Sequence, residues 1–240
     1  MPLNAVLGPP VKIRPGYGRA KVLRMAWRTM ENAFDLHYDS IHLFRRKSYG
    51  SALALSVLAA EEIGKYSILE DILYNGIANR PWSAEDTEKW LRMTYDHGVK
   101  QRMFGEMAER VLSGRSMVRI DGGTLERHKQ RGVYVGLPRR GRKADLSARF
   151  SAPRHLGRAA TRAQITTVSD CLVTLCLGCS ADYYLLESID VQDALKPSVA
   201  RTLNRRWPTM SRKAQTFART ANPKWWSRRA ITHRIPGQGA

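Results

Sequence analysis

The stretch LSVLAAEEIGKYSIL, residues 55–69, is apolar at both ends and carries Glu61, Glu62 and Lys65 in its middle. Apolar and charged positions recur there at spacings of three and four, which is typical of one face of a helix. That face comprises Leu55, Leu58, Glu62, Lys65, Leu69 and Ile72. Burying a charge is unfavourable unless the charge is paired and hydrogen-bonded. The charges therefore form either a buried structural ion pair or the edge of a polar site.

The three charged residues differ in their local partners. Glu61 and Lys65 are four residues apart with the glutamate first, the favourable order for an ion pair within a helix. Glu62 has no such local partner, so we expect its partner to be an Arg or His on another helix.

The chain around this stretch predicts an all-α fold, a bundle of four main helices. Helical spacing of apolar residues predicts helices over 19–46, 50–75, 84–113 and 156–189. Residues 1–18 read as an irregular tail, and the helical domain as 19–194. Within that domain, 115–155 reads as a basic insertion of loop and short hairpin, with GVYVG as a possible strand. Residues 195–240 form an Arg/Trp-rich C-terminal extension.

Composition favours a soluble intracellular protein. The chain has 240 residues, 43% of them apolar, enough for a real core. The N-terminus has Pro and Gly where a signal peptide needs an apolar run, and no segment reaches the length of a membrane span. The three cysteines, Cys171, Cys176 and Cys179, lie in one apolar helix, which favours core thiols over a metal or redox site.

The net charge of +19 is concentrated in two segments. Residues 115–162 hold 13 Lys/Arg against 3 Asp/Glu, and residues 195–240 hold 11 against none. Such a field attracts polyanions, of which nucleic acid is the commonest in a cell. The alternative is a solvated basic face or a disordered tail.

A second group of polar residues lies in WLRMTYDHGVKQRMF, which brings Arg92, Asp96, His97 and Lys100 into nine residues. His97 and Lys100 share a helix face, whereas Arg92 lies roughly 140° around an ideal helix from His97. A site between two helices or two subunits could still unite them. Histidine moves protons near neutral pH and Arg or Lys stabilises phosphate charge, so these residues suit RNA cleavage without a metal.

A ferritin-like metal site is disfavoured, because Glu-x-x-His is approximated only by Asp39 and His42. Cys–His catalysis is disfavoured as well, because the thiols lie in an apolar helix.

At these residues the sequence resembles a known family. ENAFDLHYDSIHLFRRKSYGSALALSVLAAEEIGKYSIL followed by DHGVK is similar to the abortive infection protein V (AbiV) family, a bacterial phage-defence group within the HEPN superfamily. KQRGVYVGLP followed by a long helix resembles the later part of those proteins. The likeness covers about residues 20–190.

The resemblance implies a HEPN-like helical bundle that dimerises. Many HEPN proteins are metal-independent ribonucleases with an Arg-x(4–6)-His motif, two copies of which meet at the dimer interface. RMTYDH fits that spacing, with His97 as the acid/base group and Arg92 holding the scissile phosphate; Met93 departs from the polar residue that often follows the Arg. The ribose 2′-hydroxyl would attack, leaving a 2′,3′-cyclic phosphate. Glu61, Glu62, Lys65, Asp96 and Lys100 would support the pair, with Glu62 and Lys65 tied to Arg92, His97 or Lys100. Alternatively, the charged residues only fix helix register.

Basic and aromatic residues predict an RNA surface, because such residues contact phosphates and stack on bases. The insertion offers Arg139, Arg140, Arg142 and Lys143. The extension offers Arg205, Arg206, Trp207, Lys224, Trp225, Trp226, Arg228 and Arg229. In the other interpretation the tryptophans pack back onto the bundle.

Three functions stay open at this stage. The first is a dimeric ribonuclease of phage defence in the bacterial cytoplasm, acting on tRNA, mRNA or rRNA without a metal or other cofactor. The second is a non-catalytic module that represses translation by holding RNA or a ribosomal component. The third is a protein-interaction device triggered by a phage-encoded protein. None of them involves a membrane.

Overall fold

The computed structural model describes residues 19–77, 84–109, 123–136, 139–140, 143–144, 147, 153, 157–178 and 197–208. Its elements, in chain order, are α1 (Arg19–Arg45), α2 (Tyr49–Ile77), α3 (Ala84–Met93), α4 (His97–Glu109), α6 (Thr124–Val133), β1 (Arg139–Arg140), β2 (Lys143–Ala144), α7 (Arg158–Gly178) and α9 (Pro197–Arg206). The prediction of an all-α bundle is confirmed.

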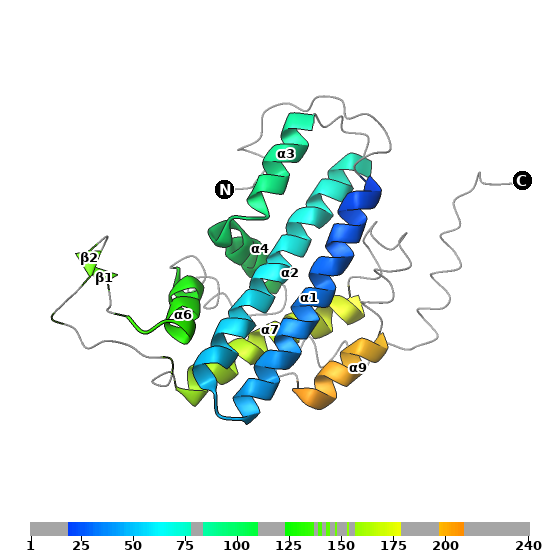
Figure 1. The fold of residues 1–240 in the computed structure, drawn as a ribbon. Coiled ribbons are helices and arrows are strands. Elements are labelled where there is room, and N and C mark those ends of the chain that lie inside the picture. The colour runs from blue at the N-terminus through cyan, green and yellow to red at the C-terminus, as the bar shows by residue number, and fades with distance from the viewer. Residues whose placement is uncertain are drawn as a thin grey trace, which may run out of the picture.

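The two long helices α1 and α2 form an antiparallel hairpin, seen side by side in Figure 1. The turn between them is tight, and Lys47 adopts a positive φ of 65° there. Small and flexible apolar side chains, among them Ala26, Met30, Ala33 and Ala60, are fully buried in the core. Small side chains let two helices approach closely, so this pair forms the rigid base on which the other helices pack.

Helix α2 is the centre of the molecule, because it packs against α1, α3, α4, α6 and α7. A helix contacted on so many sides is apolar almost all round rather than on one stripe. Two glycines set its closest approaches. A Cβ on Gly64 would lie 1.8 Å from the carbonyl oxygen of Lys100 in α4, and a Cβ on Gly132 in α6 would lie 2.5 Å from the carbonyl oxygen of Gly50. The glycines therefore seat α4 and α6 directly against α2.

The predicted single helix over 84–113 was wrong, because the structure breaks it into α3 and α4. Asp96 caps the new helix: its Oδ1 accepts a hydrogen bond from the Val99 amide at 2.9 Å. The Thr94 hydroxyl closes the preceding turn by donating to the Leu91 carbonyl at 2.6 Å. Asp is a strong N-cap residue, so an Asp inside an apparent helical pattern marked a helix start. Residues 110–113 lie outside the described residues.

The insertion contains a helix that the sequence analysis missed. Residues 124–133, predicted as loop, form α6, which packs on α2 through Gly132. The expected hairpin is present as β1 and β2, two antiparallel strands in whose backbone register Arg140 lies opposite Lys143. GVYVG does not form a strand of this hairpin, since its first two residues end α6.

Helices α7 and α9 cover the other side of the helical hairpin formed by α1 and α2. Cys171 and Cys176 are buried in α7 and form no disulfide with described residues, as expected for core cysteines; Cys179 lies outside the described residues. Helix α9, part of the predicted extension, packs on α7 and buries Leu203. The part of 156–189 beyond α7 also lies outside the described residues.

Gly64→Ala is expected to lower the free energy of unfolding by about 3 kcal/mol or more, because the new methyl group would overlap the α4 backbone. Chemical denaturation measures this loss. Gly157→Ala is the matched control, since nothing lies within 4 Å of its new Cβ. Equal stability of Gly64→Ala and the wild type would show that α4 is not seated against Gly64.

His37 makes stability depend on pH. Its ring is fully buried in α1, neither nitrogen has a hydrogen-bond partner among the described residues, and burial lowers the pKa of His37 to about 3. The unfolded chain therefore takes up this proton at about pH 6.5 while the folded chain does not, so stability falls as pH falls. From about pH 7 to about pH 5 the expected loss is about 2 kcal/mol.

Denaturation of His37→Leu at both pH values tests this expectation, because the substitution should remove that share of the pH dependence. His42→Gln, which changes an exposed histidine of the same helix, should keep it. An unchanged pH slope in His37→Leu would contradict the assignment.

Candidate active site

The Glu61 carboxylate is the centre of a polar cluster. Glu61 is 1% exposed and lies on the buried side of α2. Its Oε1 accepts hydrogen bonds from Lys129 Nζ at 2.8 Å and Gln101 Nε2 at 2.9 Å. Its Oε2 lies 2.6 Å from His97 Nδ1 and 3.7 Å from Lys100 Nζ. A buried carboxylate needs such partners, and here both oxygens have them.

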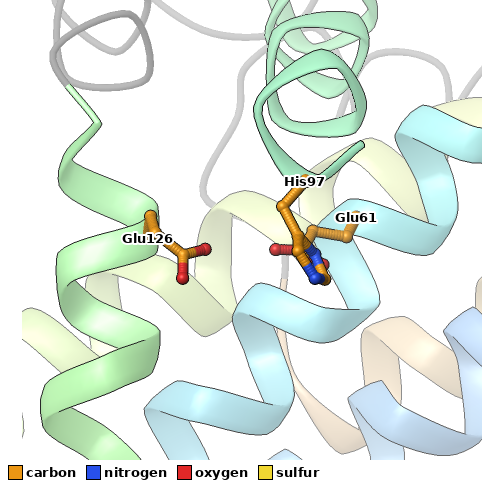
Figure 2. Close-up of side chains that lie close together, drawn as sticks. All are labelled: Glu61, His97 and Glu126. Carbon is orange, nitrogen blue, oxygen red and sulfur yellow. The ribbon is translucent and has the colours of Figure 1, made fainter. Parts of the chain in front are cut away.

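Three helices supply the cluster, as Figure 2 shows for Glu61 on α2, His97 on α4 and Glu126 on α6. Glu126 joins it through Lys129 Nζ at 2.7 Å and Gln101 Nε2 at 3.2 Å. Gln130 Nε2 donates to its other oxygen at 2.7 Å. The cluster therefore ties the basic insertion to the central helix through α6.

His97 lies at the solvent edge of the cluster. Its side chain is 55% exposed, while the carboxylate that holds it is buried. The short contact to Glu61 favours a hydrogen on Nδ1, since a carboxylate only accepts. Among the described residues no hydrogen bond reaches Nε2, so in the neutral ring that nitrogen is an available acceptor on a half-exposed side chain. A carboxylate that fixes one tautomer and leaves the other nitrogen basic is the arrangement used in general-base histidines.

Charge balance within the cluster is set by Lys129 and Glu126. Burial opposes the charged form of Lys129, but hydrogen bonds to Glu126 and Glu61 outweigh it and raise the Lys129 pKa. Burial likewise opposes the charged form of Glu126, yet hydrogen bonds from Lys129 and Gln130 hold the Glu126 pKa below its ordinary value. Both groups are therefore charged at neutral pH.

The structure separates Arg92 from His97. Arg92 lies in the last turn of α3, whereas His97 begins α4 beyond the turn. The Arg92 side chain is 78% exposed and pairs with Glu88 at 2.5 Å. No hydrogen bond joins Arg92 to His97 within this chain, where both residues are described. Asp96, predicted as a supporting residue, caps α4 and so fixes the position of His97 at the first turn.

The predicted partners of Glu62 and Lys65 were wrong. Glu62 does not pair with Arg92, His97 or Lys100; its described ion pair is with Lys65 at 3.5 Å. Glu61, expected to pair with Lys65, reaches the other helices instead. Leu55, Leu58, Glu62 and Lys65 all lie on a half-buried rim of α2. The last two members of the predicted stripe, Leu69 and Ile72, are buried as expected. The stripe therefore holds only in part, because a helix that is apolar all round gives little indication of its orientation.

Sequence reasoning also missed Gln101, Glu126, Lys129 and Gln130 as site residues. Gln101 directly follows Lys100, and adjacent residues on a helix point in different directions. Spacing along the helix therefore did not suggest that both would reach one site. The other three lay in a segment taken for loop, where spacing carries no facing information. The stretch LERHKQ did contain a pattern typical of a helix, since Glu126 lies three residues before Lys129 and four before Gln130.

The predicted RNA surface is described only in part. Arg139, Arg140 and Lys143 lie in the β1–β2 hairpin, and Arg205 is exposed near the end of α9. Arg206 stacks its guanidinium 4.4 Å from the centre of the Tyr38 ring. Trp207 packs back onto the bundle, edge-on to Phe44, and donates its indole N–H to Thr166 at 2.9 Å. Arg142, Lys224, Trp225, Trp226, Arg228 and Arg229 lie outside the described residues.

The fold and the cluster together define a class of protein: a helical bundle in which a buried carboxylate holds a half-exposed histidine. The family model described as AbiV, of the HEPN group, matches residues 21–172. The match includes α1, α2, α4, α6 and most of α7, so every residue of the cluster lies within it. The chain belongs to the AbiV family of the HEPN superfamily, and that family suggests a role in abortive infection, a form of phage defence.

Comparison with curated proteins and with solved structures gives no match. Among the described helices, none is both long enough and apolar enough to cross a membrane.

The adjacent glutamates provide a matched test of the cluster. Glu61→Gln should lower the free energy of unfolding by about 3 kcal/mol, because it leaves buried cations without their counter-charge. Glu62→Gln should cost less than about 1 kcal/mol, since the Glu62–Lys65 pair is partly exposed. Chemical denaturation of both variants measures the difference, and equal losses would contradict the central place of Glu61.

Proposed function

We propose that the protein is a metal-independent endoribonuclease of abortive infection, with His97 as its acid/base group. The observation that carries the proposal is the 2.6 Å contact between His97 Nδ1 and the buried Glu61 carboxylate. This contact orients the ring, leaves Nε2 open at the surface and stabilises the imidazolium that forms when Nε2 takes a proton.

The reaction would proceed by internal transfer on RNA. His97 Nε2 removes the proton from a ribose 2′-hydroxyl, and the 2′-oxygen attacks the adjacent phosphorus. The bond from phosphorus to the 5′-oxygen breaks, and the leaving oxygen takes up the proton that the His97 imidazolium gives back. The products are a 2′,3′-cyclic phosphate and a 5′-hydroxyl end, so no water or metal enters this step.

Phosphate recognition must come from outside the cluster. The two lysines near Glu61 are balanced by Glu61 and Glu126, so they add little free positive charge. Arg92 is solvent-facing, and among the described residues its ion pair is with the exposed Glu88. In a homodimer, Arg92 of one copy could meet His97 of the other, which would unite the pair that a single chain keeps apart. The basic residues of the insertion and extension would extend the contact along tRNA, mRNA or rRNA.

A second candidate is a non-catalytic module that binds RNA or a ribosomal component. One observation favours it: the cluster ties α2, α4 and α6 together, which is sufficient reason for its charges without any reaction. In either case we expect action in the bacterial cytoplasm. A phage-encoded protein would serve as the trigger, because an unregulated effector would harm its own cell.

Purified protein incubated with total RNA and tRNA in EDTA tests the proposal. We expect cleavage that leaves cyclic phosphate ends, slowed about 100-fold or more in His97→Ala because the general base is lost. Arg92→Ala should also slow cleavage, through loss of phosphate stabilisation. Analysis of the product ends and of initial rates gives both results.

His42→Ala is the matched control, since His42 is an exposed histidine on α1, away from the cluster. Its rate should equal that of the wild type. RNA that stays intact with wild-type protein, together with binding that survives His97→Ala and Arg92→Ala, would favour the non-catalytic module instead.

A further inference from the structure

The cluster contains a set of side chains that would ordinarily suit a metal ion. Glu61, His97 and Glu126 each offer one ligand atom, and these atoms all lie within 4.8 Å of one another. Carboxylate oxygens and imidazole nitrogens are common ligands of zinc and related divalent cations. The geometry therefore gathers negative charge and lone pairs at one point between three helices.

A cation from the chain itself already lies at that point. Lys129 Nζ is 2.8 Å from Glu61, 2.7 Å from Glu126 and 3.3 Å from His97 Nδ1. The Lys129 side chain is only 10% exposed, so the two carboxylates have replaced most of the water around its ammonium group. Lys100 Nζ does not occupy this point, because it approaches Glu61 from the other carboxylate oxygen, Oε2, at a distance of 3.7 Å.

We propose that the Lys129 ammonium is the resident cation of the Glu61–His97–Glu126 group and keeps divalent metal ions out of it. Lys129 then acts as a positioning residue. It neutralises two carboxylates that would otherwise repel each other, and it binds Glu61 through Oε1, so Oε2 keeps its short contact with His97. This inference goes beyond the proposed ribonuclease activity and stands without it.

The position of Lys129 also bears on the histidine tautomer. His97 Nδ1 lies between an acceptor, Glu61 at 2.6 Å, and a donor, Lys129 at 3.3 Å. The ammonium makes two shorter hydrogen bonds to carboxylates, at 2.8 and 2.7 Å. Its contact with Nδ1 is longer than the contact between Nδ1 and Glu61, so Glu61 is the stronger partner of that nitrogen. Lys129 therefore holds the carboxylates in place without taking the ring nitrogen from Glu61.

The experiment is a titration of Lys129→Met with Co²⁺, followed by the visible absorption of the bound ion. Removing the ammonium should open the ligand set, so the variant should bind one Co²⁺ at least tenfold more tightly than wild-type protein. Adding His97→Ala to Lys129→Met should abolish the gain, because a ligand is lost. A structural role of Lys129 alone would not create this absorption.

Lys65→Met is the matched control, since it removes a lysine of another ion pair on α2 and should bind no more Co²⁺ than wild type. Equal Co²⁺ binding by wild type and Lys129→Met, whether strong or absent, would overturn the proposal.

A measurement on the wild-type chain keeps the test open if Lys129→Met does not fold. Nuclear magnetic resonance of ¹⁵N-labelled lysine ammonium groups should show a slowly exchanging signal assigned to Lys129, which disappears in Glu126→Gln. A Lys129 ammonium that exchanges with water as fast as an exposed lysine would contradict its enclosure by the three groups.

Discussion

The burial of the Glu61 carboxylate is the constraint on which the rest of the site depends. A charge on the inner side of a central helix is tolerated only when cations and donors reach it from neighbouring helices. Here α4 supplies His97, Lys100 and Gln101, and α6 supplies Lys129. Helices that must meet one carboxylate cannot slide or rotate freely. The same interaction therefore fixes helix register and orients the histidine.

Backbone contacts place these helices at the right distance. Gly64 lies three residues after Glu61 and lets the α4 backbone approach α2 at Lys100, while Gly132 does the same for α6. The EEIGK stretch thus combines a charge and a contact surface within one turn of helix. The break at Asp96 completes the arrangement, because it begins α4 at His97 and leaves that side chain at the solvent edge.

The sequence predicted the helical class, the bounds of α1 and α2 to within two residues, and the burial of Cys171 and Cys176. It also singled out His97 and the EEIGK stretch, which the structure brings into contact through Glu61. It did not predict which glutamate faces inward, because α2 is contacted on nearly all sides and its pattern shows no clear apolar face. It missed α6, since Gly and Arg around that helix suggested loop. Lys129 was missed with it: a residue's partners across a bundle depend on packing, which spacing along one segment does not reveal.

The account rests most directly on the claim that Glu61 holds His97 by its Nδ1. Nuclear magnetic resonance of the ¹⁵N-labelled imidazole reports which ring nitrogen carries the hydrogen in the neutral state. We expect the Nδ1–H tautomer for His97 in the wild type and a shift toward the commoner Nε2–H form in Glu61→Gln. An Nε2–H tautomer in the wild type, or the same spectrum in Glu61→Gln, would contradict the claim.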